Sequence, residues 1–220
     1  MNTHHVFEFN GATFWALAEG ALWWPSQKLL CVSDLHLGKS DRIARRSGRM
    51  LPPYETEATL DRLGNLVSRL APSTIICLGD SFDDLDAALG LSEEHKARIT
   101  TLQAGRTWIW VEGNHDPGPI DIGGDHKAEV MVEGLTFRHI AAPYANAEVS
   151  GHYHPKCRLQ TGSSRPAFLI NDSRIVLPAF GTYTGGLRAS DSALKTLMGP
   201  NATAILTGKK ALAVPMAATT

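Results

Sequence analysis

The sequence contains few cysteines and no long apolar run. Its three cysteines, Cys31, Cys77 and Cys157, are too few and too scattered for a disulfide scaffold, and the first two lie in apolar runs as expected of reduced core residues. No apolar run approaches the roughly 20 residues that cross a bilayer. The N-terminus, MNTHHVFEFNG, lacks the basic and apolar regions of a signal peptide. We therefore expect a cytoplasmic protein without a membrane partner.

The chain also lacks a charge excess and a linker. Its formal net charge is −1, so no global positive field attracts nucleic acid, and any such binding requires a local basic patch. There is no Pro/Gly/Ser-rich linker, internal repeat or low-complexity segment. We expect one domain over residues 1–220, with residues 216–220 frayed.

Apolar patterning predicts an α/β fold. Short apolar runs at 28–33, 74–79, 107–112, 135–140 and 147–150 predict strands. Helical spacing of leucines over 52–72, and a capped segment at 91–105, predict helices between the first three strands, which implies βαβ crossovers and a parallel sheet. Later runs at 167–172, 174–180, 202–207 and 211–215 are separated by turn residues with little helix. They predict a second, more antiparallel sheet packed on the first.

Residue types that bind metals follow the first five predicted strands. In chain order they are Asp34 and His36, Asp80, Asn114 with His115 and Asp116, His139, and His152 with His154. A single strand end of this kind is as typical of a turn as of a metal site, because Gly, Asn, Asp and Pro are turn residues. Ligands of open α/β sheets bind beyond the carboxyl ends of the strands, where five such ends meet. The series therefore predicts a metal site.

The ligand types restrict the metal. Carboxylate, imidazole and amide groups without thiolate favour Mn, Fe or Zn. Seven candidate ligands exceed the three or four protein groups that one catalytic ion takes. Two ions about 3.5–4 Å apart that share a carboxylate would use them all, and such a pair activates a bridging hydroxide for in-line attack on phosphorus.

The motifs DLH, GDSFD, GNHD, a lone His and GHYH occur in an order that resembles the calcineurin-like metallophosphoesterases, over about residues 28–155. The resemblance implies a four-layer α-β-β-α sandwich of two mixed sheets and two divalent ions, Mn²⁺ with Zn or Fe as alternatives. It implies that one ion is held by Asp34, His36, Asp80 and His154, and the other by Asp80 as the bridge, Asn114, His139 and His152. It also implies that His115 protonates the leaving oxygen and that Asp116 orients the His115 ring.

A narrower resemblance covers nearly the whole chain. The stretches ALWWP, SDLHLGKS, DRIARRSGRMLPP, GHYHPKC and LPAFGTYTGG are together similar to the bacterial ligase-associated DNA damage response endonucleases. This likeness implies a DNA substrate, a role in DNA repair and a functional association with a DNA ligase and a helicase. The chain departs from the pattern at Asp83-Asp84, where a His-Ser pair is expected. It departs again at Ile140-Ala141, where an acidic residue and Pro are expected.

A basic cluster follows the first two ligands. It contains Lys39, Arg42, Arg45, Arg46 and Arg49. Such residues supply sequence-independent contacts to DNA phosphates, and a short helix would place the arginines on one side. The alternative is a solvated helix face. The acids Asp83, Asp84 and Asp86 are expected to be loop or helix-start residues, and for Asp83 the alternative is a contact that supports a metal ligand.

Two other functions remain open from the sequence. One is a phosphatase or cyclic-nucleotide phosphodiesterase with a small substrate, and the other is a scaffold that keeps the fold without catalysis. The presence of His115 and of a full ligand set favours an enzyme.

Overall fold

The computed structural model describes residues 3–48, 54–116, 118, 121–160 and 162–220. In this part of the chain the strands are β1 His4–Phe9, β2 Ala12–Leu17, β3 Leu22–Trp24, β4 Leu29–Val32, β5 Thr74–Leu78, β6 Thr107–Val111, β7 Asp125–Lys127, β8 Glu129–Val132, β9 Leu135–Arg138, β10 Glu148–Ser150, β11 Lys156–Cys157, β12 Arg165–Ile170, β13 Arg174–Val176, β14 Thr203–Leu206 and β15 Leu212–Pro215. The helices are α1 Lys39–Ser47, α2 Glu55–Leu70, α3 Leu85–Leu89, α4 Glu93–Gln103 and α5 Ser192–Met198, with short 3₁₀ turns at Pro25–Gln27 and Met216–Ala218.

The strands form two mixed sheets. The first runs in the order β1 to β7, antiparallel from β1 to β4 and parallel from β4 to β7. The second has the order β15-β14-β12-β13-β10-β9-β8, with β11 beside β12. Its central strands β13, β10 and β9 are parallel, and its outer pairs are antiparallel.

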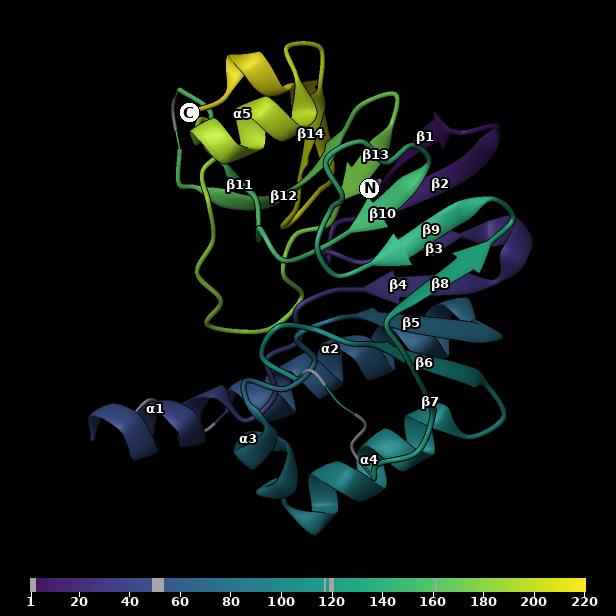
Figure 1. The fold of residues 1–220 in the computed structure, drawn as a ribbon, viewed down its shortest axis with the longest axis vertical. Helices are drawn as coiled ribbons and strands as arrows, with labels where there is room; N and C mark the ends of the chain where they lie inside the picture. Colours follow the sequence, from purple (N-terminus) through teal and green to yellow (C-terminus); the bar gives the residue numbers. More distant parts are fainter. Residues whose placement is uncertain (1–2, 49–53, 117, 119–120, 161) are drawn as a thin grey trace.

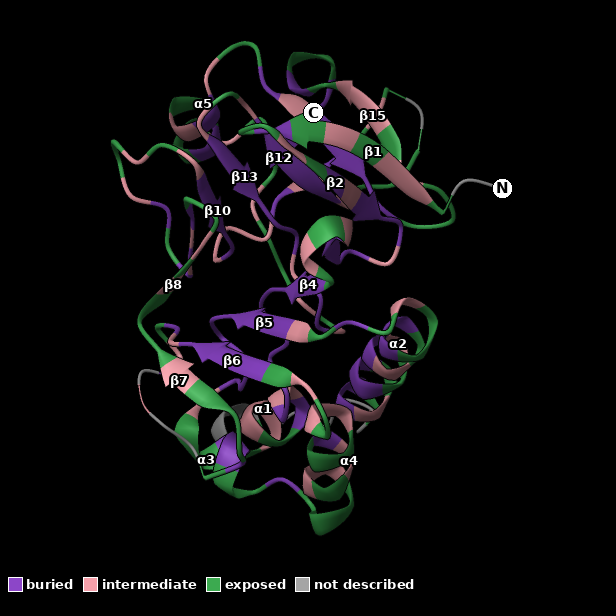
Figure 2. Cartoon of the chain, turned by 90° about the vertical axis from the view of Figure 1, so that its right-hand side faces the viewer, coloured by how far each residue is buried: buried purple, intermediate pink, exposed green. Residues whose placement is uncertain are grey.

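Four layers result (Figure 1). One apolar core lies between the first sheet and helices α2 and α4, and includes Leu60, Leu63 and Ile99. A second core joins the inner faces of the two sheets, and a third lies between the second sheet and α5. Strands β4, β5 and β6 are therefore covered on both faces (Figure 2), which explains their nearly continuous apolar sequences. The predicted α-β-β-α sandwich is confirmed.

The sequence predictions fail for weakly patterned elements. The strands predicted at 28–33, 74–79 and 107–112 are β4, β5 and β6, and Ser92 caps α4 as expected. The hairpin strands β1 to β3 and the short helix α5 were missed. The prediction of a frayed end was wrong, because Met216 is buried and Arg158 and Thr220 exchange two backbone hydrogen bonds of 2.9 Å.

The three cysteines are buried and free, as expected for Cys31 and Cys77. None of the helices in the described ranges is both long and apolar enough to cross a bilayer.

The loops that follow the parallel strands pair with one another. The amides of Asp34 and His36 donate to the carbonyls of Gly79 and Asp80, and Gly151 donates to His139. These bonds continue the strand order beyond the sheet edges. They bring the ends of β4, β5, β9 and β10 to one place.

Candidate active site

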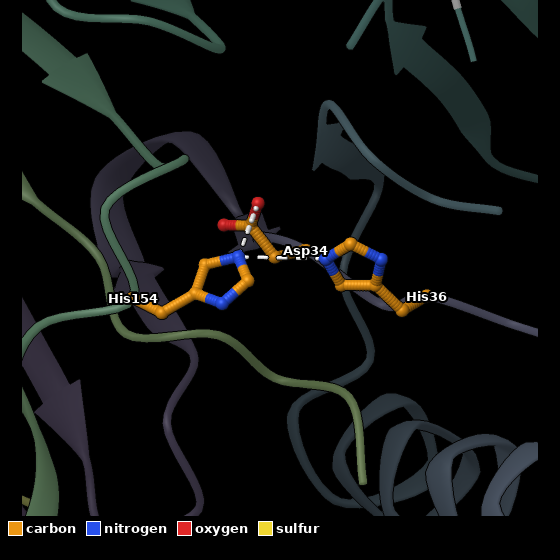
Figure 3. Close-up of side chains that lie close together, drawn as sticks. All are labelled: Asp34, His36 and His154. Atoms are coloured by element: carbon orange, nitrogen blue, oxygen red, sulfur yellow. Dashed lines mark hydrogen bonds and ion pairs between the residues drawn. The ribbon is translucent and has the colours of Figure 1, made fainter. Parts of the chain in front are cut away.

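Asp34, His36 and His154 form a first group of potential metal ligands (Figure 3). Nε2 of His154 lies 3.0 Å from Oδ1 of Asp34 and 3.4 Å from Nε2 of His36. Asp34 is fully buried, and its other oxygen accepts hydrogen bonds from Ser33 Oγ at 2.5 Å and the His152 amide at 3.0 Å. The Ser33 hydroxyl and the His152 amide thus fix one carboxylate oxygen, while the other lies against the His154 ring.

Asp80, His139 and His152 form a second group. Nε2 of His139 lies 3.3 Å from Asp80 Oδ2, 3.3 Å from His152 Nδ1 and 3.1 Å from Asn114 Oδ1. The other ring nitrogen of His139 lies 3.1 Å from the carbonyl of Leu78. A hydrogen bond from Nδ1 to this carbonyl leaves Nε2 free to bind a metal.

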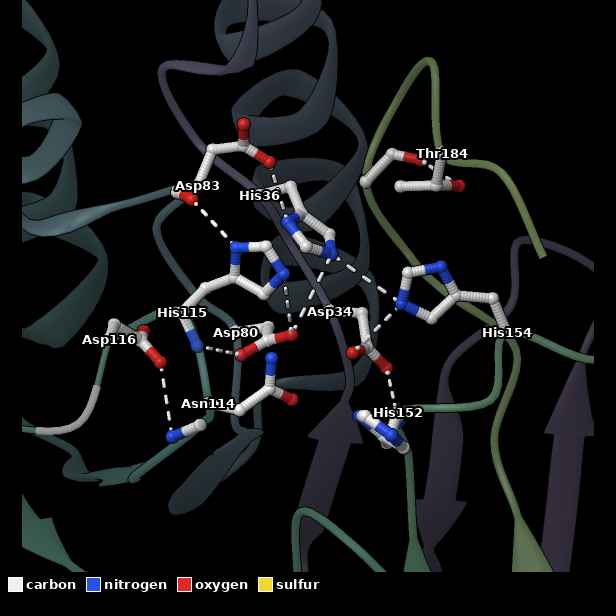
Figure 4. A network of polar contacts seen from close by, with 12 residues as sticks. Asp34, His36, Asp80, Asp83, Asn114, His115, Asp116, His152, His154 and Thr184 are labelled. Carbon is white, nitrogen blue, oxygen red and sulfur yellow. Dashed lines mark hydrogen bonds and ion pairs between the residues drawn. The ribbon is translucent and has the colours of Figure 1, made fainter. Parts of the chain in front are cut away.

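One oxygen of Asp80 lies between the two groups (Figure 4). Its Oδ2 is 3.3 Å from His139 Nε2 in the second group and 4.0 Å from His36 Nε2 in the first. A carboxylate in this position can serve two ions. All seven predicted ligands are therefore brought together, in the division that the family resemblance implied.

The donor atoms suit divalent cations. Nitrogen and oxygen ligands of one tetrahedral ion, with bonds of 2.0–2.2 Å, lie about 3.3–3.6 Å from one another. The spacings of 3.0 and 3.4 Å in the first group and of 3.1 and 3.3 Å in the second are close to this range. Two imidazole nitrogens that face each other at 3.4 Å without a cation need a proton between them.

The ligand loops have unusual backbone conformations. Asp34, His36, Asp80, His152 and His154 all have φ between 45° and 69°, in the left-handed region that side chains other than glycine rarely adopt. Such strain is concentrated at functional sites, where the surrounding structure maintains it.

Glycines make room for the ligands. A Cβ on Gly79, whose φ is +73°, would lie 2.2 Å from Nδ1 of His139, and a Cβ on Gly151 would lie 1.8 Å from Ser33 Oγ. The two sheets can therefore approach closely at the site only with glycine at these positions.

Proximity of the ligands shifts their pKa values. Burial raises the pKa of Asp80, but hydrogen bonding and the charge of His139 outweigh it and lower the pKa to about 2. Conversely, burial lowers the pKa of His139, but Asp80 and Asp34 outweigh it, and the net shift is upward. The pKa of His36 is lowered, chiefly by burial. A cation would have to displace a proton chiefly from His139.

His115 lies at the mouth of the site. Its side chain is 34% exposed, its amide donates to Asp80 Oδ1 at 2.9 Å, and its Nε2 lies 4.0 Å from Asp80 Oδ2. Its Nδ1 lies 3.0 Å from the backbone carbonyl of Asp83. This contact turns Nε2 toward the space between the two ligand groups, which is where an acid must lie to protonate a leaving oxygen.

Asp116 does not orient the ring of His115, and this prediction was wrong. Its Oδ2 accepts from the amides of Ser81 at 2.8 Å and Phe82 at 3.1 Å, and its Oδ1 accepts from the amide of Gly113 at 3.0 Å. Burial, partly offset by these bonds, raises the pKa of Asp116 to about 6. Asp116 therefore joins the ends of β5 and β6, and the Asp83 carbonyl holds the ring instead.

Asp83 lies behind the candidate ligand His36, which was the less favoured of the two roles that the sequence left open for it. It is fully buried, and its Oδ1 lies 2.8 Å from His36 Nδ1 and 3.4 Å from Lys39 Nζ. Its Oδ2 accepts a hydrogen bond from Nε of Arg42. Burial raises the pKa of Asp83, but His36, Lys39 and Arg42 lower it more. A carboxylate behind a histidine ligand fixes its ring and raises its basicity. The sequence feature that pointed to this role was the presence of Asp83-Asp84 where the family resemblance leads one to expect a His-Ser pair.

The same contacts change the interpretation of the basic cluster. Lys39 and Arg42 are turned toward Asp83, and their side chains are 16% and 20% exposed. Arg45 is 42% exposed and pairs with Asp84 at 2.9 Å, and Asp84 also caps α3, as expected of a helix-start acid. The Arg46 side chain and all of Arg49 lie outside the described part of the chain. Lys39, Arg42, Arg45 and Arg46 belong to helix α1, a helix that was predicted here, but Lys39, Arg42 and Arg45 have acidic partners.

The sandwich of two mixed sheets and the two ligand groups where the sheets meet define a metallophosphoesterase. A family model described as calcineurin-like phosphoesterase matches residues 27–197. The chain therefore belongs to the calcineurin-like phosphoesterase family.

Solved structures of similar fold include the crystal structure of Pseudomonas putida nuclease MPE. It is 25% identical, with a TM-score of 0.78, over 96% of this chain and 100% of that chain. Yfce, a phosphoesterase from E. coli, is 13% identical with a TM-score of 0.40, over 86% of this chain and 98% of that one. No curated protein matches the chain.

Proposed function

We propose that this chain is a nuclease that hydrolyses DNA phosphodiester bonds with two divalent cations, Mn²⁺ in the first instance. The observation that carries the proposal is the position of Asp80. A single oxygen of this carboxylate lies between the two ligand groups and 4.0 Å from Nε2 of His115. A phosphate at this point would meet both cations and an acid at once.

The roles of the side chains follow from their contacts. The bound cations would supply Lewis acidity toward the phosphoryl oxygens and an activated water. Asp34 and Asp80 would supply the negative charge that holds the cations, and the Ser33 hydroxyl and the His152 amide fix Oδ2 of Asp34. Protonated His115 donates from Nε2 to the leaving oxygen, while the Asp83 carbonyl accepts from Nδ1 and sets the ring plane.

The DNA substrate and a role in DNA repair are supported by the likeness to a nuclease of known structure and by the sequence resemblance to ligase-associated endonucleases. A functional association with a ligase and a helicase is part of the same proposal. A cavity of about 410 Å³ lies beside Asn114 and His139 and leaves space next to the second ligand group. Arg45 on α1, whose side chain is 42% exposed, is the proposed contact to a flanking phosphate.

A small-substrate phosphodiesterase is the second candidate. The specific observation in its favour is that Asp83 forms ion pairs with both Lys39 and Arg42, which turns two of the side chains proposed to contact a strand backbone toward the protein. A cyclic nucleotide has no neighbouring phosphates and does not need them.

The test is hydrolysis by metal-free protein reloaded with Mn²⁺, with a DNA strand, a cyclic nucleotide and an activated aryl phosphodiester as substrates. His115→Ala should lose about 10²- to 10⁴-fold in rate on DNA and much less on the aryl ester, whose leaving group needs little protonation. His95→Ala is the matched control, because His95 pairs with Glu57 on the helical layer. Turnover of the cyclic nucleotide with intact DNA would establish the second candidate. Equal losses on DNA and aryl ester would show that His115 is not the acid.

A further inference from the structure

A cavity of about 600 Å³ has in its wall Tyr153, the residue that follows the candidate ligand His152. Its walls are the loop between β9 and β10, with Pro143 and Tyr144, the residue Tyr153 after β10, and helix α5 from Ser192 to Leu197. The rings of Tyr153 and His152 have centroids 5.2 Å apart and cross at 80°. One wall of the cavity is therefore in contact with a metal ligand.

The loop that carries Tyr144 is held from beneath by a buried ion pair. Arg174 and Glu148 are 3% and 0% exposed, and Arg174 Nη1 lies 3.3 Å from Glu148 Oε1. Arg174 donates to the carbonyls of Ala142 at 3.1 Å and Ala145 at 3.2 Å, and Glu148 accepts from the Ala142 amide at 2.9 Å. A buried pair is costly unless further hydrogen bonds satisfy it. Here those bonds bracket the two residues at the tip of the loop.

The tip presents an aromatic ring to solvent. Tyr144 is 100% exposed, although burial of an aromatic side chain is among the larger contributions to stability. Its backbone is fixed by Pro143 and by the bonds on either side, so its ring is held at the cavity without packing into the core. Tyr144 therefore contributes no contact that the fold requires.

The cavity has the chemistry of a nucleobase site. Two tyrosines line it, with the hydroxyl-bearing Ser192 and Thr196 on the α5 wall. No charged side chain lines it among the described residues, so it does not suit a phosphate. A nucleobase has two apolar faces, which stack on aromatic rings, and polar edges, which accept and donate hydrogen bonds.

We propose that this cavity binds an unpaired nucleobase of the substrate strand, stacked on Tyr144 and lying against Tyr153. The proposal rests on the nuclease function proposed above and specifies its substrate as a single-stranded or locally unpaired nucleic acid. Because Tyr153 directly follows the ligand His152, the base belongs to a nucleotide next to the scissile phosphate. A base in duplex would have to leave its stack at a cost of a few kcal/mol, which favours strands that are already unpaired.

The experiment measures cleavage of short single-stranded oligonucleotides by the Mn²⁺-loaded protein. An abasic nucleotide is placed at successive positions around the cut site, and bis(p-nitrophenyl) phosphate serves as a substrate without a base. The proteins are the unaltered chain, Tyr144→Ala, Tyr144→Phe and the control Met131→Ala, whose side chain is 71% exposed on β8. Thermal unfolding of each variant checks that the fold is retained.

In the unaltered chain, loss of the base at one position next to the cut should lower kcat/KM by about 5- to 150-fold, the range that stacking of one base contributes. Tyr144→Ala should show the same loss on the intact strand and no further loss with the abasic strand. Tyr144→Phe should keep the dependence, because it keeps the ring. Met131→Ala should behave like the unaltered chain.

Two results would overturn the base site: an unchanged abasic profile in Tyr144→Ala, or an equal fall of strand and aryl ester cleavage in that variant. The first would show that Tyr144 does not contact the base, and the second that it acts on the metal site. Failure of the nuclease proposal would give a different result from failure of the base site. The unaltered chain would then hydrolyse the aryl ester but leave every oligonucleotide intact.

Discussion

Replacement of Asp83 by asparagine tests how the metal ligands are positioned. Asp83→Asn keeps the size of the side chain and removes its charge. In the structure this carboxylate lies 2.8 Å from His36 Nδ1 and also receives Lys39 and Arg42. An amide can still contact the ring, but it no longer raises the basicity of the imidazole or balances the two cations.

The expected loss is in metal affinity. Removal of a partner behind a metal ligand typically costs 10- to 100-fold in affinity or activity, which corresponds to about 1.4–2.7 kcal/mol. Loss of a fully buried ion-pair partner costs about 3–5 kcal/mol in stability. Because the Lys39 and Arg42 side chains are 16% and 20% exposed and can turn toward water, we expect only about 1–2 kcal/mol here.

The assay is calorimetric titration of metal-free protein with Mn²⁺, together with thermal unfolding. Asp84→Asn is the matched control, because the adjacent Asp84 pairs with Arg45 and caps α3. It should lower stability slightly and leave metal affinity unchanged. If Asp83→Asn folds and binds Mn²⁺ as tightly as the unaltered chain, Asp83 does not position His36 and the reasoning is refuted.

Two further predictions concern the metals themselves. Asp80→Asn should lower the occupancy of both ions, because Asp80 Oδ2 lies 3.3 Å from a ligand of one group and 4.0 Å from a ligand of the other; metal analysis that shows one ion fully retained would contradict a bridge. The second prediction concerns pH. The pKa of His139 is raised above 6.5 in the folded, metal-free chain. Protonation of His139 therefore stabilises the metal-free fold below pH 6.5, and this stabilisation is lost as the pH rises through the folded-state pKa. Metal binding needs the neutral ring, so Mn²⁺ affinity should rise over the same interval. Titrations at pH 6, 7 and 8 measure this, and a constant Kd would count against it.

Local pattern was enough to predict the strands that carry ligands. Strands β4, β5 and β6 are covered on both faces, so their sequences are short apolar runs that end abruptly in polar residues. Parallel strands connected by helices place these ends at one edge of the sheet. Asp34, Asp80 and Asn114 could therefore be assigned to one site from order alone.

Weak or short patterns were not enough for other elements. The hairpin strands β1 and β2 are partly exposed and of mixed polarity, and α5 spans only seven residues. The end of the chain is ordered by backbone pairing with Arg158, a partner far away in sequence. The residue types near the C-terminus do not predict such a contact.

The sequence by itself determined the ligand types, their order along the chain and the fold class, because these depend on residue chemistry and on local periodicity. Only the tertiary structure decided which groups support the ligands. Asp116 binds backbone amides and not His115, while Asp83, more than 40 residues from Asp34 and His36, holds the ring of His36 and draws Lys39 and Arg42 away from solvent. Hydrogen bonds and ion pairs depend on distances of a few ångströms between atoms that the fold brings together, and sequence spacing does not specify those distances.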